Sequence, residues 1–212
     1  MSRVVIFVNG HLPDLEQVRR LIRPADIFLA ADGGTRHALA LGLVPSLVIG
    51  DLDSLNDEDR RTLEAARTEI RRYPSNKDET DLELALHYGV ETGFDQILIV
   101  AALGDRLDQT LGNLALLTGS SLAGLDVRVD DGVEQAWFVR TNATVEGNPG
   151  DIISLIPWGG EVTGITTDGL RWPLRDETLQ PHKTRGLSNE LIGETASISL
   201  KSGLLLVVHS HH

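Results

Sequence analysis

The sequence contains no cysteine among its 212 residues. This absence excludes disulfide bonds, a cysteine nucleophile and a zinc site built from thiolates. The N-terminal stretch turns polar too early for a secretory signal peptide, and no apolar run approaches the roughly 20 residues that a membrane-spanning helix needs. We therefore expect a cytoplasmic protein that makes no use of a membrane.

Basic residues are scarce. Lysine and arginine number 19 against 31 aspartates and glutamates, which gives a formal net charge of −12. Non-specific nucleic-acid binding needs basic surface, so we expect no nucleic-acid partner. The net negative charge suits a cationic small substrate, although a role in keeping the protein in solution explains this charge equally well.

Several common site motifs are also missing. The chain has neither a Gly-x-Gly-x-x-Gly fingerprint nor a Walker A motif, so any phosphate site must differ from a P-loop. It has no Gly-x-Ser-x-Gly elbow to support a serine nucleophile. The seven histidines lack zinc spacing such as His-Glu-x-x-His, and we expect each of them to be a surface or core residue.

Up to about residue 130, apolar runs alternate with segments of helical periodicity. The runs predict strands at residues 4–8, 27–31, 47–49, 69–73 and 97–103. Helices are predicted at residues 12–22, 35–41, 57–67, 80–88 and 108–117, the third with Asn56 as N-cap and the last with Leu111, Leu114, Ala115 and Leu117 facing inward. Such alternation predicts a mostly parallel sheet flanked by helices on both faces.

Beyond about residue 131 the helical periodicity fades. Short strand patterns follow at residues 135–141, 152–157, 161–166 and 196–208, the last in two pieces, with Gly, Pro, Asn and Asp between them. We therefore predict an α/β domain at residues 1–131, catalytic and nucleotide-binding, and an all-β sandwich domain at residues 132–212, with the boundary near 131–134.

Acidic motifs occur where predicted strands give way to helices or turns. They are Ala31-Asp32-Gly33-Gly34, Gly50-Asp51-Leu52-Asp53-Ser54, Lys77-Asp78-Glu79-Thr80-Asp81 and Gly104-Asp105-Arg106-Leu107-Asp108-Gln109. In a parallel sheet the carboxyl ends of strands share one edge, where ligands bind. Clustered carboxylates there suit Mg²⁺, and Lys77 and Arg106 suit phosphate oxygens. The motifs predict Mg²⁺-assisted phosphoryl chemistry.

Each motif also has a structural explanation. Asp51 and Asp53 lie two residues apart and face one side of an extended segment, but either carboxylate can simply cap a turn. Thr80, Asp81 or Asp78 can serve only as the N-cap of the following helix. Arg106 and Asp108 can form a surface ion pair of little energetic value.

In this order and spacing, the four motifs resemble those of the thiamin pyrophosphokinase family. The C-terminal half agrees through Ile156-Pro157-Trp158-Gly159, Gly169-Leu170-Arg171-Trp172-Pro173-Leu174 and Ser188-Asn189-Glu190, so the resemblance covers nearly the whole chain. It implies a homodimeric, Mg²⁺-dependent thiamine diphosphokinase that uses ATP and thiamine and releases AMP. It also implies that the β-sandwich domain binds thiamine and forms the dimer.

The resemblance assigns roles residue by residue. The metal positions are Asp51, Asp53, Asp78 and Asp108, and the ATP positions are Asp32, Gly33, Lys77, Thr80, Asp81 and Arg106. The thiamine side is assigned to Trp172, Ser188 and Asn189, with packing as the competing role of the tryptophan. Asp53, Asp78 and Arg106 are the catalytic candidates, and either of the two carboxylates can accept the hydroxyl proton.

The chain departs from the family pattern at two positions. Many relatives have glycine where Asp105 stands and histidine where Gln109 stands. Because a glutamine side chain cannot act as an acid or a base, we assign Gln109 no role in proton transfer. Two rival functions stay open: a diphosphokinase for another heterocyclic alcohol, such as a hydroxymethylpterin, and a non-catalytic sensor of nucleotide or thiamine diphosphate.

Overall fold

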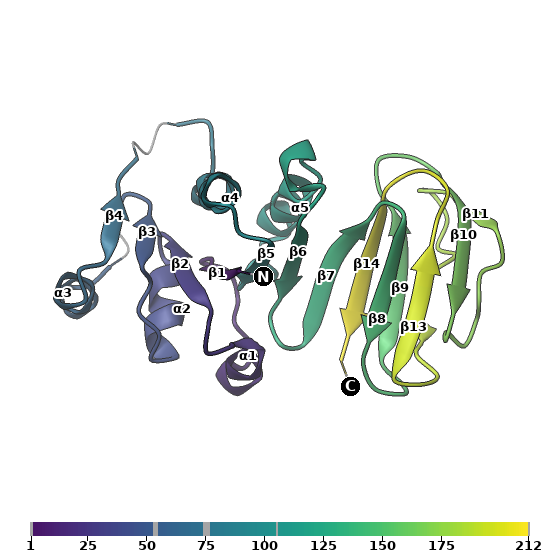
Figure 1. The fold of residues 1–212 in the computed structure, drawn as a ribbon, viewed down its shortest axis with the longest axis horizontal. Coiled ribbons are helices and arrows are strands. Elements are labelled where there is room, and N and C mark those ends of the chain that lie inside the picture. The colour runs from purple at the N-terminus through teal and green to yellow at the C-terminus, as the bar shows by residue number, and fades with distance from the viewer. Residues whose placement is uncertain (1, 53–54, 74–76, 105, 212) are drawn as a thin grey trace. The chain divides into compact units, whose positions relative to one another are not determined.

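The chain forms two compact units, Met1–Gly132 and Val133–His212. The computed structural model describes residues 2–52, 55–73, 77–104 and 106–211. The predicted site residue Asp53 and the family departure Asp105 lie outside these ranges. The first unit is an α/β structure and the second an antiparallel β-sandwich, which confirms the predicted fold class (Figure 1).

The first unit is built on a parallel sheet with the strand order β6-β5-β1-β2-β3-β4. Its strands are β1 (Arg3–Phe7), β2 (Ile27–Ala31), β3 (Leu47–Ile49), β4 (Glu69–Arg71), β5 (Gln96–Val100) and β6 (Asp126–Asp130). The chain adds β2, β3 and β4 on one side of β1, and then β5 and β6 on the other. The direction of winding thus reverses between β1 and β5, and such a reversal opens a crevice at the carboxyl ends of the strands.

Helices cover both faces of this sheet, α1, α2 and α3 on one side and α4 and α5 on the other (Figure 1). They are α1 (Leu15–Leu21), α2 (Gly34–Ala40), α3 (Asp57–Ala65), α4 (Asp81–Thr92) and α5 (Leu107–Leu116), with a short 3₁₀ turn at Ser120–Leu122. Because strand side chains alternate between faces, Val5 and Phe7 join the core with α1–α3, whereas Val4 lies beside Gly89 of α4. The predicted N-cap of α3 is confirmed, since Asn56 Oδ1 accepts the Asp59 N–H at 2.9 Å.

The prediction for the inward face of α5 is partly wrong. Leu114 and Leu117 are buried as predicted, but Leu111 and Ala115 are exposed. Asn113 is buried instead, and its side-chain amide donates to the Ala102 carbonyl oxygen at 2.9 Å. A buried amide is tolerated because the turn after β5 offers this carbonyl as a hydrogen-bond partner.

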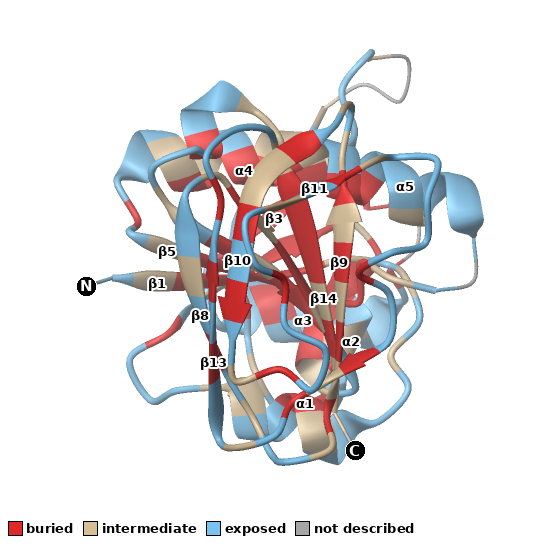
Figure 2. Ribbon diagram, turned by 90° about the vertical axis from the view of Figure 1, so that its right-hand side faces the viewer, coloured by how far each residue is buried: buried red, intermediate tan, exposed pale blue. Residues whose placement is uncertain are grey.

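The second unit consists of two antiparallel sheets, β12-β9-β14-β7 and β11-β10-β13-β8. Its strands are β7 (Glu134–Val139), β8 (Asn142–Glu146), β9 (Ile152–Pro157), β10 (Val162–Asp168), β11 (Glu177–Leu179), β12 (Asn189–Glu190), β13 (Thr195–Ser199) and β14 (Leu205–Ser210). Buried apolar side chains of both sheets form one core. Buried and exposed residues alternate along β13, as expected for a strand with one face on this core (Figure 2).

The sequence did not predict β6, β8, β11 and β12. Each is either rich in charged and polar residues or only two to three residues long. Their backbone pairing depends on neighbouring strands, which no local pattern records. Among the described residues, no helix has the length and apolar character needed to cross a membrane.

Candidate active site

A cleft of about 320 Å³ opens at the carboxyl ends of the parallel strands of the first unit. Val8 and Asn9 follow β1, Asp32 follows β2, Asp51 follows β3, and the start of α4 closes another side. The lining residues are Val8, Asn9, Ala31, Asp32, Asp51, Tyr73, Lys77, Glu79, Thr80, Asp81, Leu82, Gln109 and Asn113. The structure thus brings residues of all four acidic motifs to one cleft.

The backbone at this edge adopts unusual conformations. Asp32, Leu52 and Ala101 have φ angles of 42°, 64° and 58°, in the left-handed region that non-glycine residues seldom occupy. Each lies just beyond the end of β2, β3 or β5. The Asp32 N–H donates to the Ile49 carbonyl at 2.7 Å, which helps to fix this conformation. Strained backbone of this kind concentrates at ligand-binding sites, where surrounding structure holds it in place.

The two glycines after Asp32 allow α2 to approach the end of β1. A Cβ on Gly34 would lie 2.1 Å from the Phe7 carbonyl oxygen, and one on Gly33 would lie 2.5 Å from Asn9 Oδ1. A larger residue at Gly34 would push the strand and the helix apart, and one at Gly33 would displace the Asn9 side chain. Gly33, predicted to bind ATP, therefore leaves space for Asn9, which itself lines the cleft.

Arg60 holds the loop that carries the second acidic motif. Its Nη2 donates to the Leu52 carbonyl at 2.5 Å and its Nε to the Leu55 carbonyl at 3.2 Å. These carbonyls lie on either side of residues 53–54, and both leucine side chains are buried. The arginine thereby fixes the described ends of the loop in which Asp51 lines the cleft.

The start of α4 carries the third motif. Thr80 is the N-cap, because its Oγ1 accepts the Glu83 N–H at 3.1 Å. Lys77 Nζ lies 2.5 Å from Asp81 Oδ1 and 5.5 Å from the ring centroid of Tyr73. The capping explanation thus holds for Thr80, yet Thr80, Lys77 and Asp81 also line the cleft. Asp78 is exposed and does not line the cleft in the described part of the chain.

Arg106 and Asp108 pair at the start of α5, with Nη2–Oδ2 and Nε–Oδ1 distances of 2.5 and 3.2 Å. Their side chains are 68% and 66% exposed, so this is the surface pair considered as the alternative for this motif. The hydrogen bond from Arg106 lowers the pKa of Asp108. Neither side chain lines the cleft as described. Gln109 and Asn113, one helical turn apart, line it instead.

Sequence reasoning did not predict the roles of Asn9, Tyr73 and Asn113 in lining the cleft. Asn9 lies two residues beyond the end of β1, just after the strand predicted at residues 4–8. Asn113 is a polar residue four positions after Gln109 on one face of a helix, a spacing that could have revealed it. Tyr73 follows β4, whose short pattern carries no signal for a ligand site.

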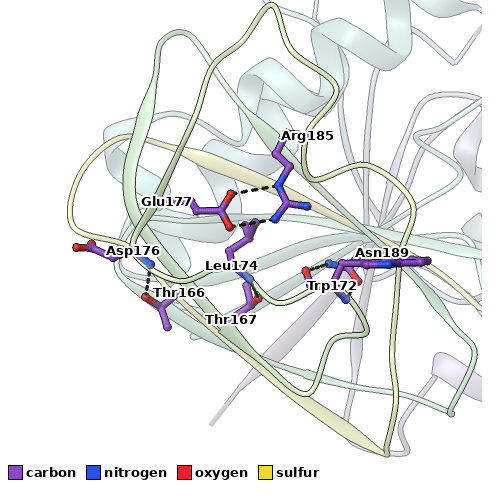
Figure 3. A network of polar contacts seen from close by, with 8 residues as sticks. All are labelled: Thr166, Thr167, Trp172, Leu174, Asp176, Glu177, Arg185 and Asn189. Atoms are coloured by element: carbon purple, nitrogen blue, oxygen red, sulfur yellow. Dashed lines mark hydrogen bonds and ion pairs between the residues drawn. The ribbon is translucent and has the colours of Figure 1, made fainter.

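The second unit holds the predicted thiamine-side residues. Asn189 is buried at 4% exposure, and its amide clamps the backbone of Trp172 (Figure 3). Asn189 Oδ1 accepts the Trp172 N–H at 3.0 Å, and Nδ2 donates to the Trp172 carbonyl at 2.8 Å. The contacts of Asn189 within the chain therefore support the loop that carries Trp172.

Further hydrogen bonds hold the same loop. Thr167 Oγ1 accepts the Leu174 N–H at 2.8 Å, and Thr166 Oγ1 accepts the Asp176 N–H at 3.2 Å (Figure 3). Ser188, immediately before Asn189, has a φ of 53°, and its N–H donates to Ser154 Oγ at 3.1 Å. The loop around Trp172 and the segment of Ser188 are thus fixed in unusual, well-bonded conformations.

The side chain of Trp172 is not part of the core of its unit, since the residue is 50% exposed. Core packing, its competing role, is therefore wrong. The guanidinium of Arg171 lies 5.5 Å from the ring centroid and pairs with Glu190 Oε2 at 2.6 Å. An exposed indole on a fixed loop can stack on an aromatic or cationic ligand.

Comparison with known proteins agrees with both halves of the chain. Residues 18–129 match the family described as "Thiamin pyrophosphokinase, catalytic domain", and residues 141–205 match "Thiamin pyrophosphokinase, vitamin B1 binding domain". A thiamine pyrophosphokinase of Bacillus subtilis (strain 168) is 31% identical over 186 residues, 87% of each chain.

Solved structures show the same similarity. The crystal structure of thiamine pyrophosphokinase from Bacillus subtilis has a TM-score of 0.90 at 27% identity and covers 100% of both chains. That of thiamin pyrophosphokinase from Geobacillus thermodenitrificans has a TM-score of 0.85 at 27% identity and covers 100% of this chain and 98% of its own. With its acidic cleft at the strand ends and its clamped tryptophan loop, this chain belongs to the thiamin pyrophosphokinase family.

Proposed function

We propose that the protein is a thiamine diphosphokinase, which transfers the pyrophosphoryl group of ATP to the hydroxyl of thiamine and releases AMP. The observation that carries the proposal is the match of both units to the two domains of one family. The cleft at the strand ends supports it, because nucleotides bind at this edge of open α/β sheets.

The cleft is strongly acidic, which suits a divalent cation. Among the residues that the structure describes, it is lined by the carboxylates of Asp32, Asp51, Glu79 and Asp81 and by the ammonium group of Lys77. Without a cation this charge would repel the triphosphate. Among the described residues no three of these carboxylates group within 4.8 Å. Mg²⁺ typically takes one or two carboxylates and completes its shell with phosphate oxygens and water, so it needs no close group of three.

We assign Asp51 as a Mg²⁺ ligand on the basis of its place in the cleft. The assignment of Asp53, Asp78 and Asp108 as further Mg²⁺ ligands rests on the family resemblance alone. When bound, Mg²⁺ neutralises phosphate charge and polarises the group under attack. Such a reaction depends mostly on positioning and electrostatics, which the described residues lining the cleft would supply.

The chemical step forms a bond between the thiamine hydroxyl oxygen and the β-phosphorus of ATP. The bond from that phosphorus to the oxygen bridging to the α-phosphate breaks, and AMP leaves with this oxygen. Asp53 and Asp78 remain the two candidates to accept the hydroxyl proton. We propose that Lys77 and the amino end of α4 bind the phosphates, together with Asp32, Gly33, Thr80 and Asp81, while Arg106 offsets developing charge.

We further propose that the second unit binds thiamine and that the protein is a cytoplasmic homodimer. Thiamine carries a permanent cationic ring, and the exposed face of Trp172 on a loop clamped by Asn189 suits such a ligand. Ser188 belongs to the same segment. We propose a homodimer because two-fold dimers are the commonest closed assemblies. A monomeric mass by light scattering at micromolar concentration, with activity retained, would contradict it.

The comparisons do not favour the two rival functions, since both matched domains are those of thiamin pyrophosphokinase. The experiment that separates all three is AMP formation from ATP and Mg²⁺, measured with thiamine, with a hydroxymethylpterin and with no acceptor. We expect AMP with thiamine only. AMP release with the pterin alone would overturn thiamine as the acceptor and leave only the diphosphokinase reaction type standing. No AMP release with either acceptor would favour a sensor.

A further inference from the structure

A second group of metal-ligand side chains lies in the β-sandwich unit. The side chains are those of Asp151, His209 and His211, and one ligand atom from each lies within 4.8 Å of the others. In the part of the chain that the structure describes, no other group of three His, Cys, Asp or Glu residues meets this spacing. The group involves none of the residues to which we assign a role in diphosphokinase chemistry.

The strand register explains why these residues meet. His209 and His211 lie two residues apart at the end of β14, and residues with this spacing face the same side of an extended strand. β14 and β9 are antiparallel, and Ser210 pairs with Ile152. Asp151, just before Ile152, and His211, just after Ser210, therefore lie at the same end of the two strands. The His211 N–H donates to the Val133 carbonyl at 3.0 Å, which holds its backbone in place.

Two of the three side chains are buried and already aligned. Asp151 is fully buried and His209 is 1% exposed, and His209 Nε2 lies 2.8 Å from Asp151 Oδ2. That carboxylate oxygen also accepts the Asn148 N–H at 2.9 Å. A Cβ on Gly147 would lie 2.6 Å from the same oxygen, so glycine at this position keeps the space around it open.

His211 completes the group from the solvent side. Its Nδ1 lies 3.8 Å from Asp151 Oδ2, its side chain is 33% exposed, and its ring centroid is 4.1 Å from that of His209. Two atoms bound to one tetrahedral Zn²⁺ at about 2.0–2.1 Å lie roughly 3.3 Å apart. The two distances from Asp151 Oδ2, 2.8 and 3.8 Å, fall about equally on either side of this value, and the two histidine ligand atoms lie within 4.8 Å of each other.

We propose that Asp151, His209 and His211 form a binding site for a divalent transition metal such as Zn²⁺. Two imidazoles and one carboxylate are ligands that Zn²⁺ takes, whereas Mg²⁺ prefers an all-oxygen shell. Metal binding releases to solvent the proton of the hydrogen bond between His209 and Asp151, and water takes the fourth position on the exposed side of His211. Bound there, it ties the end of β14 to the turn before β9.

Sequence spacing concealed this site because Asp151 lies 58 positions before His209. Only the pairing of β9 with β14 joins the His-x-His pair to its carboxylate. We had expected every histidine of the chain to be a surface or core residue. The proposal departs from that expectation on the geometry of this one group.

The test is a calorimetric titration of the full chain with ZnCl₂ after treatment with EDTA, at pH 6 and pH 8. We expect about one Zn²⁺ per chain and tighter binding at pH 8, because protonated imidazole competes with the metal. His211→Ala should lose at least about tenfold in affinity, as should His209→Gln. His182→Ala, at an exposed histidine of the same unit, and His212→Ala, at a residue outside the described ranges, serve as controls.

Binding of Co²⁺ gives an independent readout, because its visible spectrum reports nitrogen and oxygen ligation and should change with the same variants. Undiminished Zn²⁺ binding by both His209→Gln and His211→Ala would overturn the proposal, as would loss in His212→Ala alone, which indicates chelation by the chain end. No Zn²⁺ binding by the unmodified chain would also overturn it. His211 is partly exposed, so its variant remains informative even if His209→Gln does not fold.

Discussion

Asn189→Ala is the substitution that tests the thiamine side of the site most sharply. The substitution removes both hydrogen bonds between the Asn189 amide and the backbone of Trp172. It also removes the bond that Asn189 Oδ1 accepts from the Glu190 N–H at 2.9 Å. The loop then loses its clamp, while the parallel sheet and its cleft keep every contact described above.

The magnitude follows from the groups left without partners. A buried donor or acceptor that loses its hydrogen bond costs about 1–3 kcal/mol. If the Trp172 loop must recover its conformation when thiamine binds, a cost of about 1.4–2.8 kcal/mol corresponds to a tenfold to hundredfold weaker binding. We expect the KM for thiamine to rise by this factor, and the KM for ATP to change by less than about threefold.

The assay is steady-state AMP formation with each substrate varied in turn. Asn142→Ala, at an exposed asparagine of the same unit, is the matched control and should leave both constants unchanged. Asn189→Asp keeps an acceptor for the Trp172 N–H but loses the donor for its carbonyl, so it should fall between. An equal rise in both KM values for Asn189→Ala would refute the reasoning and indicate a general structural role.

Three further substitutions test the first unit. Asp51→Asn should abolish most turnover yet change the unfolding free energy by less than about 0.5 kcal/mol in urea titrations, because the residue is exposed in the cleft. Arg60→Ala should raise the Mg²⁺ concentration needed for half-maximal activity, whereas Arg61→Ala, at an exposed neighbour, should not. Burial lowers the pKa of His37 from its ordinary value of 6.5. The unfolded chain then takes up the proton more readily, so the contribution of His37 to stability is complete above about pH 6.5 and is lost as the pH falls. His37→Gln should flatten this loss in unfolding titrations down to about pH 5.

Much of the fold could be predicted from the sequence because the first unit follows strong local rules. The apolar runs that form β1, β2 and β5 are buried on both faces, and such runs are typical of parallel strands. The helix predicted at residues 80–88 is confirmed as part of α4, where the apolar spacing of Leu82, Ala85 and Leu86 coincides with the buried face. Strands such as β12, with two residues, exist only through pairing with a distant partner and leave no local pattern.

The candidate site was predictable where its chemistry lies at strand ends. Asp32, Asp51 and Asp81 stand in the cleft because the motifs follow parallel strands. The clamp of Asn189 on Trp172 was not predictable in detail, since 17 positions separate the two residues and only the folded loop joins them. Likewise, nothing in the pattern around Arg60 indicated that its guanidinium binds the carbonyls on either side of residues 53–54.

The central claim is transfer of a pyrophosphoryl group in one step, and labelled ATP tests it most directly. With thiamine and Mg²⁺ present, ATP labelled in the γ-phosphate should pass its label to thiamine diphosphate. ATP labelled in the α-phosphate should leave its label wholly in AMP. Asp51→Asn, run in parallel, should give neither product. Formation of ADP with thiamine monophosphate, or of AMP at the same rate without thiamine, would contradict the account.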